Sequence, residues 1–120
     1  MISASEGDIV FLKLGENENL ENLENILEAY EINSGFLEGF GKVKYIETEN
    51  EKFSGEVILF GLISELKGKP NLKLYCYSSH SGKVRNFLSE ELTIIVRRFD
   101  KIKLSSVIDE EGKERVVIKD

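Results

Sequence analysis

The most informative stretch of the chain is Gly68-Lys69-Pro70-Asn71-Leu72-Lys73-Leu74-Tyr75-Cys76-Tyr77-Ser78-Ser79-His80-Ser81-Gly82-Lys83-Val84, in which a turn, an alternating strand and a second turn follow one another. Apolar and polar residues alternate over residues 71–78, as in a β-strand with two different faces. A long apolar stretch at 56–65 precedes the turn at 67–70. The two stretches therefore predict an antiparallel β-hairpin.

One helix is predicted before this hairpin, within residues 15–30. Apolar residues at positions 20, 23, 26, 27 and 30 follow the helical period, and Glu and Asn fill the other face. Either Asn17 or Asn19 can cap its first turn. Strands are predicted at 9–14, 83–88, 92–99, 102–108 and 115–118, with a turn at 109–112, and residues 35–41 and 43–48 are predicted to form either one bent strand or a pair of strands. This order predicts an α+β fold, a largely antiparallel β-sheet packed with one main amphipathic helix.

Length and composition limit the class of protein. The 120 residues hold no linker, repeat or charge block, so we expect residues 1–120 to form a single domain. No apolar run is long enough to span a bilayer, so we expect no membrane partner. Residues 1–8 lack the pattern of a signal peptide, and the single cysteine excludes an internal disulfide. We therefore expect a cytoplasmic location.

The charge balance disfavours nucleic acid as a partner. With 16 basic and 22 acidic residues the net charge is −6, whereas binding to nucleic acid depends mainly on Lys and Arg contacts to phosphates. The basic residues of the second half that could gather in space are Arg97, Arg98, Lys101 and Lys103, with Lys83 and Arg85. We expect them to lie on solvated strand faces and turns.

Three residues are candidates for chemistry. His80 is the only histidine and lies in a polar turn without an evident partner, so we favour a turn residue over a base or ligand. Cys76 is predicted to share a strand face with Leu74 and to be a buried structural thiol. Glu38 lies among glycines and apolar residues at 35–41. It is either a desolvated carboxylate of a site or, the interpretation we favour, a side chain that points to water.

The combined pattern resembles a known family. The pieces are Gly15-Glu16 before the helix, Gly35-Phe36-Leu37-Glu38-Gly39-Phe40-Gly41, Gly68-Lys69-Pro70-Asn71-Leu72-Lys73-Leu74-Tyr75 and Gly82-Lys83-Val84. Over about residues 8–106 the chain resembles the plants-and-prokaryotes-conserved (PPC) domain, of the bare prokaryotic type. The resemblance implies a compact α+β domain that assembles as a homotrimer. In plants the domain follows AT-hook DNA-binding segments and mediates protein association.

Two departures limit what the resemblance implies. The AT-hook core Arg-Gly-Arg-Pro has no match, so the DNA contact of plant members does not transfer. Many prokaryotic members carry metal-binding histidines at the positions that match Lys73, Tyr75 and, after a short gap, Phe87. Because these side chains are poor zinc ligands, we expect no metal and no cofactor. For the same reason a metal-dependent lyase of the related acetolactate decarboxylase type is disfavoured.

We therefore expect a non-catalytic, PPC-like homotrimer that serves protein association or small-ligand binding at its subunit interfaces. The ligand-binding residues we expect are Glu38, Lys73, Tyr75 and Arg85. Three alternatives stay open. One is a DNA-binding protein, one is a lyase-like enzyme with a degraded metal site, and one is an enzyme that uses Glu38 or His80.

Overall fold

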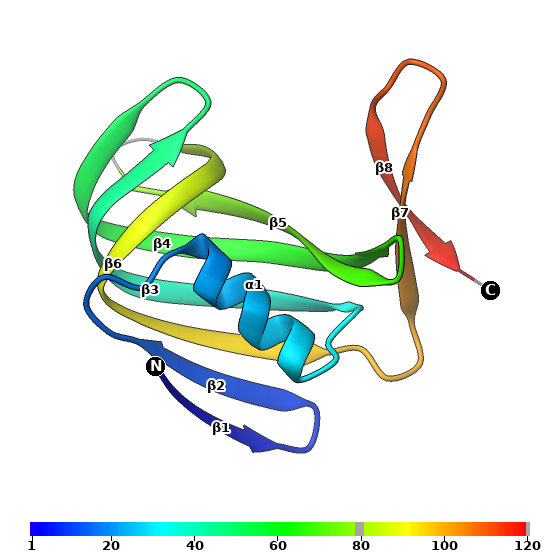
Figure 1. The fold of residues 1–120 in the computed structure, drawn as a ribbon, viewed down its shortest axis with the longest axis horizontal. Helices are drawn as coiled ribbons and strands as arrows, with labels where there is room; N and C mark the ends of the chain where they lie inside the picture. The colour runs from blue at the N-terminus through cyan, green and yellow to red at the C-terminus, as the bar shows by residue number, and fades with distance from the viewer. Residues whose placement is uncertain (79–80, 120) are drawn as a thin grey trace.

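The structure, a computed structural model, describes residues 1–78 and 81–119. Its elements along the chain are β1 (Ile2–Glu6), β2 (Ile9–Leu14), α1 (Leu20–Ala29), β3 (Gly35–Thr48), β4 (Lys52–Leu66), β5 (Lys69–Tyr77), β6 (Ser81–Arg98), β7 (Lys103–Ile108) and β8 (Glu114–Lys119) (Figure 1). This is the predicted α+β class, a mostly antiparallel sheet with one short helix in the described part of the chain. His80 lies outside the described residues.

The centre of the sheet is β3, which lies between the two longest strands, β4 and β6. Its order is β1-β2-β6-β3-β4, and every neighbouring pair in this run is antiparallel. β5 returns along β4, as the hairpin prediction requires, and its end also pairs with the start of β6. Strands β3, β4, β5 and β6 therefore curl into a partly closed barrel at one end of the molecule (Figure 1). The β7–β8 hairpin stands at the other end and meets β4 at the parallel pair Glu65 and Ser105.

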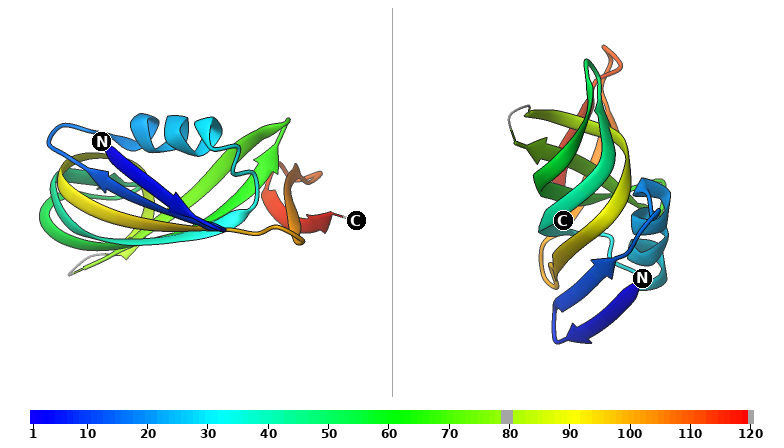
Figure 2. Two further views of the ribbon diagram at one scale, coloured as in Figure 1. Left: turned by 90° about the horizontal axis from the view of Figure 1, so that it is seen from below. Right: turned by 90° about the vertical axis from the view of Figure 1, so that its left-hand side faces the viewer.

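Helix α1 begins at a side-chain cap. Asn19 accepts a hydrogen bond from the backbone N–H of Asn22 at 3.1 Å, and its own backbone N–H donates to Asn22 Oδ1 at 2.8 Å. Of the two predicted caps, Asn19 is therefore the one used. The helix buries Leu23 and Leu27 against the sheet, on one side only (Figure 2). In the part of the chain that the structure describes, no helix is long and apolar enough to cross a membrane.

Alternate residues of β2, β3, β4, β5 and β6 point toward α1 and the inside of the barrel, where they form the core. The buried apolar residues of the strands are Val10, Leu12, Leu14, Leu37, Val43, Ile46, Val57, Leu59, Ile63, Leu74, Cys76, Val84, Phe87, Leu92, Ile94 and Val96. The other side we call the outer face. It carries Ile9 and Phe11 (β2), Thr93, Ile95 and Arg97 (β6), Phe36, Glu38 and Phe40 (β3), Ile58, Phe60 and Leu62 (β4), and Lys73, Tyr75 and Tyr77 (β5).

Of the two arrangements predicted for 35–48, a bent strand or a pair of strands, the structure has one strand, β3. The prediction of separate strands at 83–88 and 92–99 was wrong, because the two stretches form one strand, β6. Ser89 lies between the two predicted stretches, but it is buried, and its backbone N–H donates to Glu18 O at 2.7 Å. The pairing register between the two strands shifts near Val43 instead, which marks a β-bulge. A bulge lets a strand bend around the barrel without ending.

The first strand, β1, was not predicted from the sequence. All of its residues are exposed, and it pairs only with β2 across a turn at Gly7. A strand without a buried side lacks the apolar alternation by which strands are predicted. It forms the edge of the sheet in the described chain.

Candidate functional site

The outer face is arranged in rows of side chains that cross the strands. The middle row consists of Tyr75, Phe60, Glu38, Ile95 and Phe11. On one side lies the row Tyr77, Ile58, Phe40, Thr93 and Lys13, and on the other the row Lys73, Leu62, Phe36, Arg97 and Ile9. The rows cross five adjacent strands, which lie side by side in the order β2-β6-β3-β4-β5. Apolar side chains on neighbouring strands are thus within contact range of each other.

Many of these apolar side chains are open to solvent. Phe40 is 62% exposed, Tyr77 61% and Ile58 54%. Phe60 and Phe11 are exposed as well. Single exposed apolar residues are common on proteins, but a contiguous apolar surface usually marks an interaction or binding site. The outer face is therefore the principal candidate site in the described chain.

Glu38 and Tyr75, two of the predicted ligand-binding residues, share the middle row. The Tyr75 ring stacks on Phe60 with 5.7 Å between ring centroids and 13° between planes. Glu38 is on the far side of Phe60 and is exposed, as the favoured interpretation predicted. It is surrounded by apolar neighbours on the outer face nonetheless.

Lys73, the third predicted residue, is engaged at the other end of the molecule. Its Nζ lies 3.9 Å from Glu114 Oε1 of β8. The same Oε1 accepts a hydrogen bond from Ser106 Oγ at 2.7 Å and one from Asn71 Nδ2, and Ser106 Oγ is 2.6 Å from buried Ser64 Oγ. These contacts hold the β7–β8 hairpin against the sheet. Lys73 therefore already has an ion-pair partner within the chain.

Arg85 lies apart from Glu38. It is exposed near the start of β6, two residues after Lys83, which pairs with Tyr75. Arg97 and Arg98 do not gather with Lys83 and Arg85, because they are at the opposite end of β6. Arg97 is on the outer face, whereas Arg98 donates through Nη2 to the backbone O of Tyr30. The described structure does not bring these cations onto one surface.

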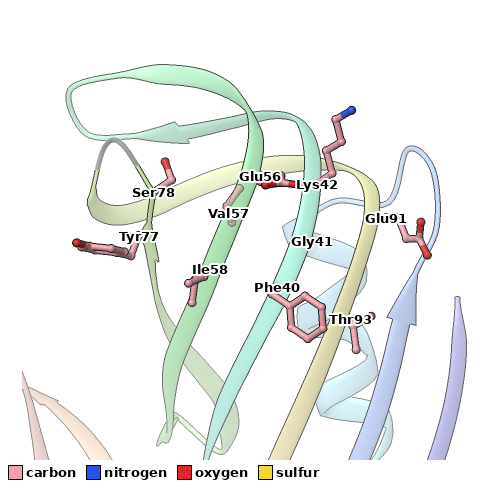
Figure 3. Close-up of a pocket in the computed structure, with 10 residues that line it drawn as sticks. All are labelled: Phe40, Gly41, Lys42, Glu56, Val57, Ile58, Tyr77, Ser78, Glu91 and Thr93. Carbon is pink, nitrogen blue, oxygen red and sulfur yellow. The ribbon is translucent and has the colours of Figure 1, made fainter.

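A hollow of about 660 Å³ lies on the outer face beside the curled end of the barrel. Its lining includes Phe40, Ile58, Tyr77, Thr93, Lys42, Glu56 and Glu91. Figure 3 shows Phe40 and Ile58 on neighbouring strands, with Tyr77 to one side and Glu91 to the other. Lys42 Nζ is 3.7 Å from Glu90 Oε2, and Lys13 Nζ is 3.0 Å from Glu91 Oε1. The hollow thus has an apolar floor, and two of its charged lining residues, Lys42 and Glu91, form ion pairs.

Cys76 is buried in the barrel, as predicted. It is 1% exposed, and its Sγ lies 3.7 Å from Gly82 O. Burial raises the pKa of the Cys76 thiol above its ordinary value, against a smaller opposing effect of the Gly82 hydrogen bond. Because the thiolate is the reactive form, Cys76 is a poor nucleophile in the folded protein.

This burial makes a direct prediction for thiol labelling. We expect an aromatic disulfide reagent at pH 8 to modify Cys76 slowly in the native protein, at least about 100-fold slower than in denaturant. The chain has a single cysteine, so the released chromophore reports this site alone. The native rate should rise with pH through the range in which a free thiol is already ionised. Labelling at equal rates in both states would mean that Cys76 is accessible.

No group of three or more His, Cys, Asp or Glu side chains within 1–78 and 81–119 is placed to hold a metal ion. Of the three residues that the resemblance places at histidine positions, Phe87 is fully buried in the core. Lys73 and Tyr75 lie on the outer face. These three side chains therefore do not converge.

The residues that were not predicted to lie on this surface are Phe36, Phe40, Ile58 and Phe60. A signal was present in residues 57–63 of β4, where Val, Ile, Leu, Phe, Gly, Leu and Ile follow one another. In a strand with one solvated face, apolar and polar residues alternate. An uninterrupted apolar run indicates instead that both faces of the strand are buried. In the single chain only one face of β4 is covered by α1 and the barrel interior (Figure 2).

Comparison with known proteins gives structural relatives. No family model and no curated protein matches the sequence. A candidate DNA-binding protein from Bacteroides thetaiotaomicron matches with a TM-score of 0.86 at 14% identity, over 97% of this chain and 96% of that one. One from Ralstonia eutropha JMP134 matches with a TM-score of 0.83 at 15% identity, over 98% and 96%.

A plant- and prokaryote-conserved protein from Pyrococcus horikoshii matches with a TM-score of 0.74 at 16% identity, over 92% of this chain and 91% of that one. At such identities the likeness concerns the fold alone. The resemblance predicted from the sequence is confirmed at that level, and the chain has the fold of the PPC proteins.

Proposed function

We propose that this protein is a non-catalytic homotrimeric module that covers its outer face with neighbouring copies and serves protein association or small-ligand binding at the interfaces. The observation that carries the proposal is the apolar surface that β2 to β6 share opposite α1. Fully burying one Phe or Ile side chain contributes about 1.5–3 kcal/mol. Several such residues together provide a driving force for association.

The trimeric state is supported by the resemblance to the PPC domain. Identical chains in head-to-tail contact form a closed ring when the rotation between neighbouring chains permits it. In a closed ring every chain has its contact surface covered by a neighbour. The compact sheet with one free face suits such an arrangement.

Small-ligand binding is supported by the residues at the middle row. Glu38 and Tyr75 flank Phe60 and offer a carboxylate and an aromatic ring on one apolar surface. We keep Lys73 and Arg85 as further ligand-binding candidates, with Lys73 limited by its contact to Glu114.

DNA binding is the competing function, because two of the structural relatives are described as candidate DNA-binding proteins. The net charge of −6 and the separation of Arg85 from Arg97 on β6 speak against it. We expect no retardation of duplex DNA at about 50 mM salt. Retardation that declines steeply with salt and weakens on Arg97→Ala would favour this alternative.

The oligomeric state tests the proposal directly. We expect native mass spectrometry to give three times 13.6 kDa, with the same species by light scattering in solution. Added mass on that species would report a ligand retained at the interfaces. A monomer at micromolar concentration would contradict the proposal, since an uncovered outer face would then be the stable state.

A further inference from the structure

Apart from Lys73, which pairs with Glu114, two charged residues interrupt the apolar part of the outer face. Glu38 lies between Phe60 and Ile95 across the strands. Along β3 its neighbours on the same face are Phe36 and Phe40. Its four nearest positions on this surface are therefore apolar.

Arg97 lies in the adjacent row of the outer face. Its cross-strand partners are Phe36 on β3 and Ile9 on β2, and Ile95 precedes it on the same face. Its side chain is exposed. Like Glu38, it is a single charge in apolar surroundings.

Neither charge is used within the described chain. Among the ion pairs and side-chain hydrogen bonds of residues 1–78 and 81–119, those of Lys13, Lys42 and Lys73 involve Glu91, Glu90 and Glu114, and none involves Glu38 or Arg97. A contact that covers the surrounding apolar residues removes water from both charges. Leaving either one without an opposite charge would cost several kcal/mol, so a covered outer face requires them to be paired.

We propose that Glu38 of one copy forms an ion pair with Arg97 of the next copy, so that each subunit completes the charge balance of its neighbour's outer face. The inference rests on the proposed association through this face. In a ring of identical head-to-tail contacts, every copy gives its Glu38 to one neighbour and its Arg97 to the other. The pair sets the register of the apolar surfaces and excludes contacts that leave a charge buried alone.

Charge reversal tests the pair. We expect Glu38→Arg and Arg97→Glu each to weaken assembly at least about 100-fold, because each places like charges at every contact. The double variant restores opposite charges and should recover most of the affinity. Matched controls are Glu110→Arg and Lys101→Glu, which make the same charge changes at exposed positions off the sheet face and should leave assembly unchanged.

A mixture of the two single variants distinguishes pairing between copies from pairing within one copy. Glu38 and Arg97 are diagonal neighbours across β3 and β6, at a separation of roughly 7–8 Å that long side chains can bridge. Pairing between copies predicts that mixed trimers regain opposite charges at two of their three contacts. Pairing within a copy predicts no recovery on mixing, because each variant chain keeps two like charges.

The outcomes separate the inference from the proposed function. Native mass spectra of wild type, single variants, double variant and mixture are compared at equal concentration, with circular dichroism to verify the fold of each. Recovery in both the double variant and the mixture supports the pair between copies. A monomeric wild type overturns the proposed function itself. A trimeric wild type whose single variants stay trimeric, or whose mixture fails to recover, overturns the ion pair between copies alone.

Discussion

Phe60→Asp is expected to convert the assembly into monomers, with the association constant reduced by at least about 1,000-fold. Phe60 occupies the middle row of the outer face, next to Glu38 and stacked on Tyr75. The substitution removes an aromatic anchor and adds a carboxylate beside an existing one, in a surface from which assembly excludes water. Both the lost aromatic ring and the added carboxylate weaken association.

The fold of the single chain should survive this change. Phe60 is 42% exposed and faces away from the core, so its replacement leaves the packing against α1 intact. Loss of the ring stack with Tyr75 is expected to cost about 0.5–1.5 kcal/mol of stability. Circular dichroism and thermal unfolding measure this cost separately from assembly.

Ile118→Asp is the matched control for Phe60→Asp. Ile118 is 74% exposed on β8, in the hairpin at the end of the molecule and away from the outer face. We expect light scattering to show a trimer for Ile118→Asp and a monomer for Phe60→Asp. A trimer that persists with Phe60→Asp would mean that the outer face is not the surface through which copies associate.

The elements that sequence reasoning predicted are those with a local signal. The helix has apolar residues at helical spacing with Asn19 at its start, and the β4–β5 hairpin has its turn at Lys67 and Gly68, both with positive φ. The continuity of β6 has no such signal. Ser89 continues the strand because its backbone bonds to Glu18 and Asn17, residues far away in sequence.

The candidate site could be predicted only in part for a related reason. Glu38 and Tyr75 are recognisable as a carboxylate and an aromatic residue on strands, but their common row depends on the register of β3 with β4 and of β4 with β5. Register over long strands follows from the whole sheet, not from either segment. The pairing of Lys73 with Glu114 likewise depends on where the last hairpin docks.

Gly41→Ala is expected to be among the most destabilising single substitutions in the chain. Gly41 has a φ of 149°, and a Cβ at this position would lie 2.1 Å from Glu91 O and 3.0 Å from Leu92 Cα. Both atoms belong to the backbone of β6, so no side chain can move aside. We expect a loss of about 3 kcal/mol or more, or roughly 10 °C in the melting temperature.

Two other glycines separate the causes of this loss. Gly55 also has a positive φ, 114°, but a Cβ there would have no atom within 4 Å, so Gly55→Ala reports the backbone conformation alone, about 1 kcal/mol. Gly15 has neither constraint, and Gly15→Ala should change stability by less than about 0.5 kcal/mol. Thermal unfolding must be compared at one protein concentration, because assembly adds to apparent stability. Gly41→Ala could also lower the free energy of unfolding no more than Gly55→Ala does. In that case β6 would be able to move away from β3, and the close approach of these two strands would not determine the shape of the curled end of the outer face.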